Sequence, residues 1–335
     1  MTTAPRIRVQ RRPVHGVLLL DKPLGLSSNQ ALQKAKWLLR AEKAGHTGTL
    51  DPLASGVLPL CFGATTKFSG LHLDADKTYE TTVCLGVSTT TGDAEGAVTA
   101  RQPVPHITQQ QLEAVRQRFL GRIQQVPPMH SALKKEGKAL YEYARAGIEV
   151  ERTAREVEIH ALDMSLEQNV DGCAVLHMVV RCSKGTYIRT LGEDIGKALG
   201  CGGHLTHLRR IATGPFTAKQ CITLEALETM NEAERMAQLL PIEALLPDYT
   251  PITLSNAEAG RFLSGLRRRG SWPDTEHAAV FGAQPRALLG TGHVKTGELI
   301  ATRLLTPAEI TQTLEQAPFN TSLAQDISVE PGGKA

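Results

Sequence analysis

The chain has 335 residues, of which 41% are hydrophobic, and its 37 basic and 34 acidic residues give a formal charge of +3. This length and composition exclude a collagenous or disordered chain and predict two folded domains. Because the bulk charge is small, a nucleic-acid surface would have to come from local clusters of basic residues. Six scattered cysteines without a CxxC pair, and no apolar stretch of membrane-spanning length, predict a soluble cytoplasmic protein with reduced thiols.

The chain begins with residues 1–13, which contain four arginines and no acidic residue. We expect a disordered basic tail, with a phosphate-contacting arm as the alternative. Residues 16–20 predict a buried strand, and the turn that follows contains Lys22. The next helix is predicted to be capped by Ser27 or Ser28.

The segment 45–69 is rich in glycine and places Asp51 directly before Pro52. Proline biases the preceding residue toward an extended conformation, so we expect Asp51 in a rigid, non-helical backbone. Such a backbone can aim a carboxylate. For an arbitrary Asp-Pro pair, however, a simple turn is the usual interpretation.

Residues 77–85 alternate between polar and apolar types, which predicts a half-buried strand with Tyr79 on its inward face. Thr108 and Gln111 are spaced as a helix capping box. The following stretch, 125–147, combines three lysines and two tyrosines. It is either a solvated loop and helix or a basic lid over nucleic acid, because lysines contact phosphates and aromatic rings stack on bases.

Two strands are predicted at 155–166 and 173–182, and the second leads into a helix that starts near Ile188. This junction can aim Tyr187 and Arg189 into a site.

The spacing of Cys201, His204 and His207 could begin a zinc site, but no nearby fourth ligand completes it, so we predict no metal. Phosphate-loop and dinucleotide-binding motifs are also absent from the sequence, and no cofactor is expected.

Several strings resemble one known family. Residues 45–69, GHTGTLDPLASGVLPLCFGATTKFS, closely resemble the catalytic segment of the TruB family of bacterial tRNA pseudouridine-55 synthases. LLLDKPLGLSSN, KTYE, KGTYIRTLGEDIG and GGHLTHLRR resemble further motifs of that family. The resemblance covers most of residues 16–216 with specific motifs.

The resemblance implies a set of site residues. Asp51 would be the nucleophile or base, Tyr79 would stack on the uracil and take part in proton transfer, and Arg189 would hold Asp51. A cation within a few Å keeps a partly desolvated carboxylate ionised. The implied substrate-binding residues are His46, Tyr187, Leu208, Lys22 and Lys67.

The resemblance also implies the fold, which is of the α/β (α+β) class. We expect a catalytic domain at 14–245, built on a mixed, largely antiparallel sheet flanked by helices, with a thumb insertion at about 125–152. A small all-β pseudo-barrel (PUA-like) RNA-binding domain would follow at 251–320, before a disordered tail at 321–335. The thumb departs from the family pattern at His130, where the family often has tyrosine.

The function implied is isomerisation of uridine 55 in the T loop of tRNA to pseudouridine, after the base is flipped out of the loop. We expect a monomer that binds the T stem-loop and requires no protein partner, cofactor or membrane. Two alternatives are a tRNA-binding folding helper and an isomerase of the same superfamily acting on ribosomal RNA. Whether Asp51 attacks C1′ or assists through a glycal-type intermediate is left open by the sequence.

Overall fold

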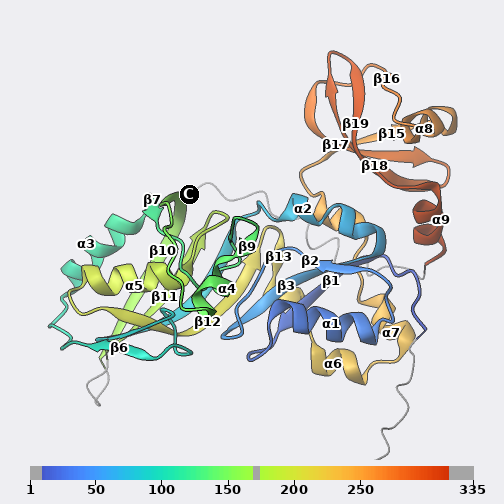
Figure 1. Cartoon of the computed structure of the whole chain (residues 1–335). Coiled ribbons are helices and arrows are strands. Elements are labelled where there is room, and N and C mark those ends of the chain that lie inside the picture. Colours follow the sequence, from blue (N-terminus) through green and yellow to red (C-terminus); the bar gives the residue numbers. More distant parts are fainter. Residues whose placement is uncertain (1–9, 169–173, 317–335) are drawn as a thin grey trace, which may run out of the picture. The chain divides into compact units, whose positions relative to one another are not determined.

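The computed structural model describes residues 10–168 and 174–316 (Figure 1). The chain divides into two compact units, each assembled from segments that are distant in sequence. Unit 2 contains Leu50–Gly56 and Asp74–Gly214, and unit 1 contains the described residues before, between and after these segments. The expected domain boundary at 245–251 falls inside unit 1, so that division stays a prediction. The expected tail at 321–335 and most of the one at 1–13 lie outside the described residues.

Unit 2 is built on a sheet whose strand order is β3, β12, β4, β11, β10 and β7. Strands β3 and β12 are parallel, and the remaining neighbours are antiparallel. The expected mixed, largely antiparallel sheet of an α/β protein is therefore confirmed. The elements of this unit are β4 (Lys77–Leu85), β5 (Val87–Thr89), β6 (Val98–Arg101), α3 (Gln109–Phe119), β7 (Gly121–Gln125), β8 (Lys134–Lys135), β9 (Lys138–Ala139), α4 (Leu140–Arg145), β10 (Arg155–Gln168), β11 (Ala174–Cys182), α5 (Ile188–Ala198) and β12 (Gly203–Thr213), with the start of β3 (Ala54–Phe62).

Strand β4 follows the alternation expected from its sequence. Thr81, Val83 and Leu85 are buried, whereas Glu80 is exposed. Helix α5 packs against β12 and continues the apolar core on the inward face of the sheet. The helix after Thr108 begins as predicted, because the Thr108 side chain and Gln111 form a complete capping box.

Unit 1 combines the N-terminal elements with the C-terminal third of the chain. One apolar cluster joins residues of β1, β3, the 240–246 segment and strands β17 and β18. A separate five-stranded sheet has the order β15, β17, β18, β19 and β16. The elements are β1 (Gly16–Lys22), α1 (Ser28–Leu38), β2 (Ala44–His46), η1 (Gly63–Lys67), α2 (Ser69–His72), β13 (Phe216–Thr217), η2 (Ala218–Gln220), β14 (Ile222–Thr223), α6 (Leu224–Thr229), α7 (Glu232–Ala237), η3 (Ile242–Leu245), β15 (Thr250–Leu254), α8 (Asn256–Leu263), β16 (Arg268–Arg269), β17 (Thr275–Ala283), β18 (Arg286–Lys295), β19 (Glu298–Leu304) and α9 (Pro307–Glu315).

The last residues of the expected basic tail are held in unit 1. Arg11 donates a hydrogen bond of 2.8 Å to the Ala41 carbonyl, and Arg12 forms an ion pair of 2.7 Å with Glu232. Residues Arg11 and Arg12 of the expected tail are therefore fixed by contacts with the rest of unit 1.

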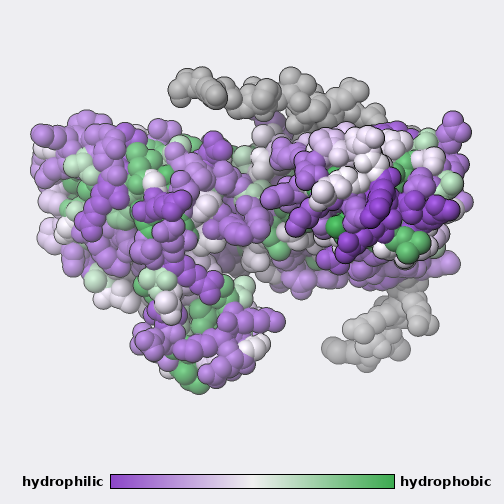
Figure 2. All heavy atoms as spheres, turned by 90° about the horizontal axis from the view of Figure 1, so that it is seen from above, coloured by the Kyte–Doolittle hydropathy of each residue, from purple (hydrophilic) through white to green (hydrophobic). Residues whose placement is uncertain are grey.

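The surface is mainly hydrophilic on the face seen in Figure 2, where apolar areas are small and separated. Large apolar side chains that are exposed, such as Trp37 and Leu266, are scattered over different elements. Within the described ranges, every helix is too short or too polar to cross a membrane.

Gly56 provides a test of how β3 and β12 pack. Its φ of +102° disfavours any L side chain, and a Cβ there would collide with the Arg210 carbonyl oxygen. We expect Gly56→Ala to lower the free energy of unfolding by roughly 3 kcal/mol or more. Gly260→Ala in α8 is the control, because a Cβ there meets open space, and it should raise stability by about 0.5–1 kcal/mol. Urea denaturation of both variants makes the measurement, and equal effects would show that this close approach does not constrain the fold.

Candidate active site

The expected pair of Asp51 and Arg189 is present in unit 2. Arg189 lies in the first turn of α5, and its Nη2 is 2.9 Å from Oδ2 of Asp51. The Arg189 side chain is only 7% exposed, whereas that of Asp51 is 39% exposed. The carboxylate therefore has one side on a buried cation and another side open to a substrate.

The Arg189 guanidinium also binds three oxygen atoms from other segments. Nη1 donates to the Thr91 carbonyl at 3.0 Å and lies 3.5 Å from Oδ2 of Asp93, while Nη2 donates to the His130 carbonyl at 2.7 Å. A planar guanidinium can serve several oxygens in fixed directions, which an ammonium group cannot do. Arg189 is thus held in place before any substrate arrives.

Asp93 is a site residue that sequence reasoning missed. Its side chain is 4% exposed, and its Oδ1 accepts hydrogen bonds from Thr91 Oγ1 at 2.5 Å and from the Glu95 N–H at 3.1 Å. These two bonds hold Asp93 in a local turn. The second carboxylate oxygen faces Arg189.

The position of His130 contributes through its backbone. Its backbone carbonyl accepts a hydrogen bond from Arg189, and a residue of any type at this position would supply that carbonyl. The departure from the tyrosine of the family pattern is therefore compatible with this contact. A polar hollow of about 520 Å³ borders Thr91 and His130 and is also lined by Glu193 of α5.

Tyr79 and Leu208 lie on neighbouring strands of the same sheet. Leu208 is buried on β12 and pairs in register with Thr81 of β4 and with Ala54 of β3. Burial raises the pKa of Tyr79, while the charge of Arg210 and a hydrogen bond with it act in the opposite direction. Asp51 is also close enough to act on the pKa of Tyr79.

Tyr187 forms the N-cap of α5 and is fixed through its backbone. Its N–H donates to Gln125 Oε1 at 3.0 Å, and Gln125 Nε2 donates back to the Tyr187 carbonyl at 3.3 Å. Burial raises the pKa of the Tyr187 hydroxyl, and the charges of Arg155 and Arg189 oppose that shift. Gln125 is buried and, like Asp93, was not identified from the sequence.

Three expected substrate-binding residues lie in unit 1. Lys22 is fully buried, and its ammonium donates to the carbonyls of Pro23 and Leu26 at 2.8 and 2.5 Å. Lys67 is paired with Glu309 of α9 at 2.6 Å. His46 ends β2. Their roles toward a substrate stay predictions.

The possible zinc ligands make other contacts. Cys201 Sγ donates to the Gly196 carbonyl at 3.8 Å, and His204 Nδ1 lies 2.8 Å from the Val87 carbonyl oxygen. Among the residues that the structure describes, no three histidine, cysteine or acidic side chains are grouped as metal ligands would be.

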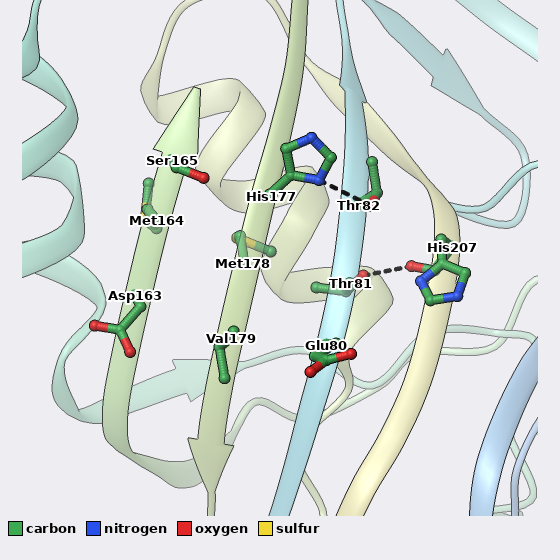
Figure 3. Close-up of a pocket in the computed structure, with 10 residues that line it drawn as sticks. All are labelled: Glu80, Thr81, Thr82, Asp163, Met164, Ser165, His177, Met178, Val179 and His207. Atoms are coloured by element: carbon green, nitrogen blue, oxygen red, sulfur yellow. Dashed lines mark hydrogen bonds between the residues drawn. The ribbon is translucent and has the colours of Figure 1, made fainter. Parts of the chain in front are cut away.

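A second hollow, of about 370 Å³, lies over β10, β11, β4 and β12 (Figure 3). Glu80 and Thr82 of β4 line it. Because successive side chains of a strand point to opposite faces, these two residues lie on the face of the sheet opposite to Tyr79. Neither Asp51 nor Arg189 contributes to its lining. We therefore place the candidate active site at the ion cluster of Asp51, Asp93 and Arg189, and not in this hollow.

Comparison with known proteins gives a consistent result. Residues 36–188 match the family described as "TruB family pseudouridylate synthase (N terminal domain)", and residues 189–247 match the "tRNA pseudouridylate synthase B C-terminal domain". The chain belongs to the TruB family. It is therefore a pseudouridine synthase, which is an isomerase.

Two curated TruB relatives illustrate the similarity. A tRNA pseudouridine synthase B of Verminephrobacter eiseniae is 62% identical over 95% of this chain and 97% of its own length. The corresponding protein of Cupriavidus pinatubonensis is 57% identical over 89% of this chain and 96% of its own.

Solved structures share the fold. A Cbf5-Nop10-Gar1 complex contains a chain with a TM-score of 0.64 and 25% identity, over 88% of this chain and 86% of that one. An H/ACA RNP bound to a substrate RNA contains a chain with a TM-score of 0.63, 22% identity and the same coverage.

The ion cluster predicts a large effect of Arg189 on stability. Arg189→Met would leave the buried Asp93 carboxylate without its cation, which should lower the free energy of unfolding by about 3–5 kcal/mol. Arg189→Lys keeps the charge and should lose less. The matched control is Arg181→Met, because Arg181 is 60% exposed and its 3.2 Å pair with Asp76 should contribute about 1 kcal/mol or less. Equal losses in urea denaturation of the two Met variants would contradict this account.

Proposed function

We propose that this protein isomerises uridine 55 in the T loop of tRNA to pseudouridine, with Asp51 as the catalytic nucleophile or base. The observation that carries the proposal is the half-exposed Asp51 carboxylate held 2.9 Å from the buried Arg189 guanidinium. The names of the curated relatives support tRNA as the substrate.

The reaction conserves all atoms of the nucleotide. The N1–C1′ bond breaks, the uracil turns, and C5 bonds to C1′, while C5 loses a proton and N1 gains one. Asp51 would stabilise the ribose carbon as N1 departs, either by attack on C1′ or as a base in a glycal-type route. Arg189 would keep Asp51 ionised and oriented, because a cation nearby favours the charged form of a carboxylate.

A uridine in a folded loop has to leave its stack before its glycosidic bond can be reached. In the proposed complex Tyr79 stacks on the extruded uracil, and Leu208 and Tyr187 line the pocket. His46, Lys22 and Lys67 would complete substrate binding. The half-buried Tyr79 and the buried Leu208 supply the apolar surface that such a base requires.

The basic thumb supports RNA as the partner. Lys134, Lys135 and Lys138 are exposed in β8 and β9, and Lys138 lies 4.9 Å from the ring centroid of Tyr143. Exposed lysines beside aromatic rings suit a nucleic-acid backbone and its bases. We propose that this segment closes over the T stem-loop, and that the C-terminal five-stranded sheet is a PUA-like RNA-binding domain.

We further propose that the protein acts in the cytoplasm as a monomer without a protein partner. The chain of 25% identity was solved in a complex with Nop10 and Gar1, so this point needs its own test. Purified protein alone should convert a tRNA transcript.

Asp51→Asn should abolish turnover. We expect a loss of roughly 10⁴-fold or more, because the substitution removes the reacting carboxylate, while tRNA affinity stays within several-fold because phosphate and shape contacts lie elsewhere. The assay incubates purified protein with an unmodified tRNA transcript and maps pseudouridine. Asp163→Asn, at an exposed position of β10, is the control and should act like wild type.

Residual turnover near the wild-type rate in Asp51→Asn would overturn the assignment of Asp51. Wild-type protein that binds tRNA but forms no pseudouridine would favour the folding helper, and conversion of ribosomal RNA fragments alone would favour the related isomerase.

A further inference from the structure

Arg210 is a buried cation to which the proposed mechanism gives no role so far. It lies on β12 and is 1% exposed, which makes it one of the largest fully buried side chains among the described residues. Burying a guanidinium has a considerable desolvation cost, which favourable contacts with its neighbours must offset. These neighbours therefore indicate which groups Arg210 stabilises.

The strand register places Arg210 beside Tyr79. The two are partners across the antiparallel pair of β12 and β4, and on its other side Arg210 pairs with Gly56 of β3. Partners across a ladder have Cβ atoms about 4.5–5.5 Å apart, so their side chains meet. Arg210 forms a hydrogen bond with the Tyr79 side chain.

The groups around Tyr79 oppose one another. The pKa of Tyr79 is raised, first by burial and then by Cys182 and Asp51, and the charge and the hydrogen bond of Arg210 limit this rise. Lys77, two residues earlier on β4, has its own pKa lowered to about 8, first by burial and then by the charge of Arg210. Arg210 is the cation that acts directly on the phenol oxygen.

The proposed isomerisation needs a proton acceptor at C5. Once C5 has bonded to C1′, it still carries its original hydrogen. Transfer of that proton to a Tyr79 phenolate returns the C–H electron pair to the uracil ring and restores the double bond, while N1 takes a proton from solvent. A neutral phenol cannot accept this proton, so the step requires the anionic form of Tyr79.

We propose that Arg210 is a positioning residue that stabilises the anionic form of Tyr79 and aims its oxygen, so that Tyr79 accepts the C5 proton. This inference rests on the proposed function. Arg210 would act in the second half of the reaction, when C5 loses its proton. Arg189 would act in the first half, when the N1–C1′ bond breaks, through its pairing with Asp51.

The first test is the pH dependence of the single-turnover rate on an unmodified tRNA transcript. In Arg210→Met the rise of rate with pH should move to higher pH, and the rate at pH 7 should fall roughly tenfold or more, since acid–base assistance commonly contributes about 10²–10⁴-fold. Arg210→Lys should restore part of both effects. Arg209→Met is the matched control, because Arg209 is adjacent on β12 and alternation points it to the opposite face, and it should keep the wild-type profile.

The second test does not depend on turnover. The chain has five tyrosines, so NMR of protein labelled at tyrosine Cζ can follow each ring, and Tyr79→Phe assigns the signal. The Tyr79 signal should titrate at higher pH in Arg210→Met than in wild type and be unchanged in Arg209→Met. Arg210→Lys, which keeps a buried charge, should show a smaller shift and serves as the test even where Arg210→Met does not fold.

The outcomes separate the two proposals. If wild type converts tRNA but the Arg210 variants keep the wild-type pH profile, or the Tyr79 signal titrates as in wild type, the role of Arg210 is overturned and the proposed function stands. If wild type forms no pseudouridine, the proposed function fails whatever the titration shows.

Discussion

The candidate site depends on one buried guanidinium. Arg189 binds two carboxylates and two backbone carbonyls, which come from three loops and not from its own helix. The two carboxylates differ in exposure, 39% for Asp51 and 4% for Asp93. This difference allows a division of labour in which Asp93 fixes the cation and leaves Asp51 accessible.

The same cation limits how the site can move. Because both Nη atoms are already hydrogen-bonded, Arg189 cannot turn toward a phosphate without giving up bonds inside the protein. A buried donor or acceptor that loses its partner costs about 1–3 kcal/mol. The Asp51 carboxylate is therefore held in one direction, which suits chemistry at a single carbon atom.

The sequence predicted those site residues whose local pattern is distinctive. Asp51 precedes a proline, and Arg189 follows a strand that leads into a helix, so both could be named with the help of the family motifs. Asp93 could not be named, because its first oxygen bonds only to neighbouring residues of a turn and the contact of its second oxygen with Arg189 is long-range. Arg210 was hidden for a related reason, since a strand sequence does not reveal its partner across the ladder.

The fold was predicted well where one periodicity governs a segment and less well elsewhere. The alternation in 77–85 gave β4 with its correct bounds. Within residues 223–240 the sequence has no proline or glycine to mark a break, yet the first helix ends at Thr229 and Asn231 caps a second helix with Glu234. The sequence could not show which segments make up each compact unit, because each unit joins segments that are far apart along the chain.

The long-range contacts of Arg189 also determine when the site can exist. Its partners Thr91 and His130 precede it by 98 and 59 residues. Closing loops of that length has an entropic cost, and the contacts that form when α5 packs against the sheet offset it. During synthesis, Asp51 therefore emerges and remains without its cation until α5 has been made. The candidate site cannot form before then, so the pairing of Asp51 with Arg189 is a late event in the folding of unit 2.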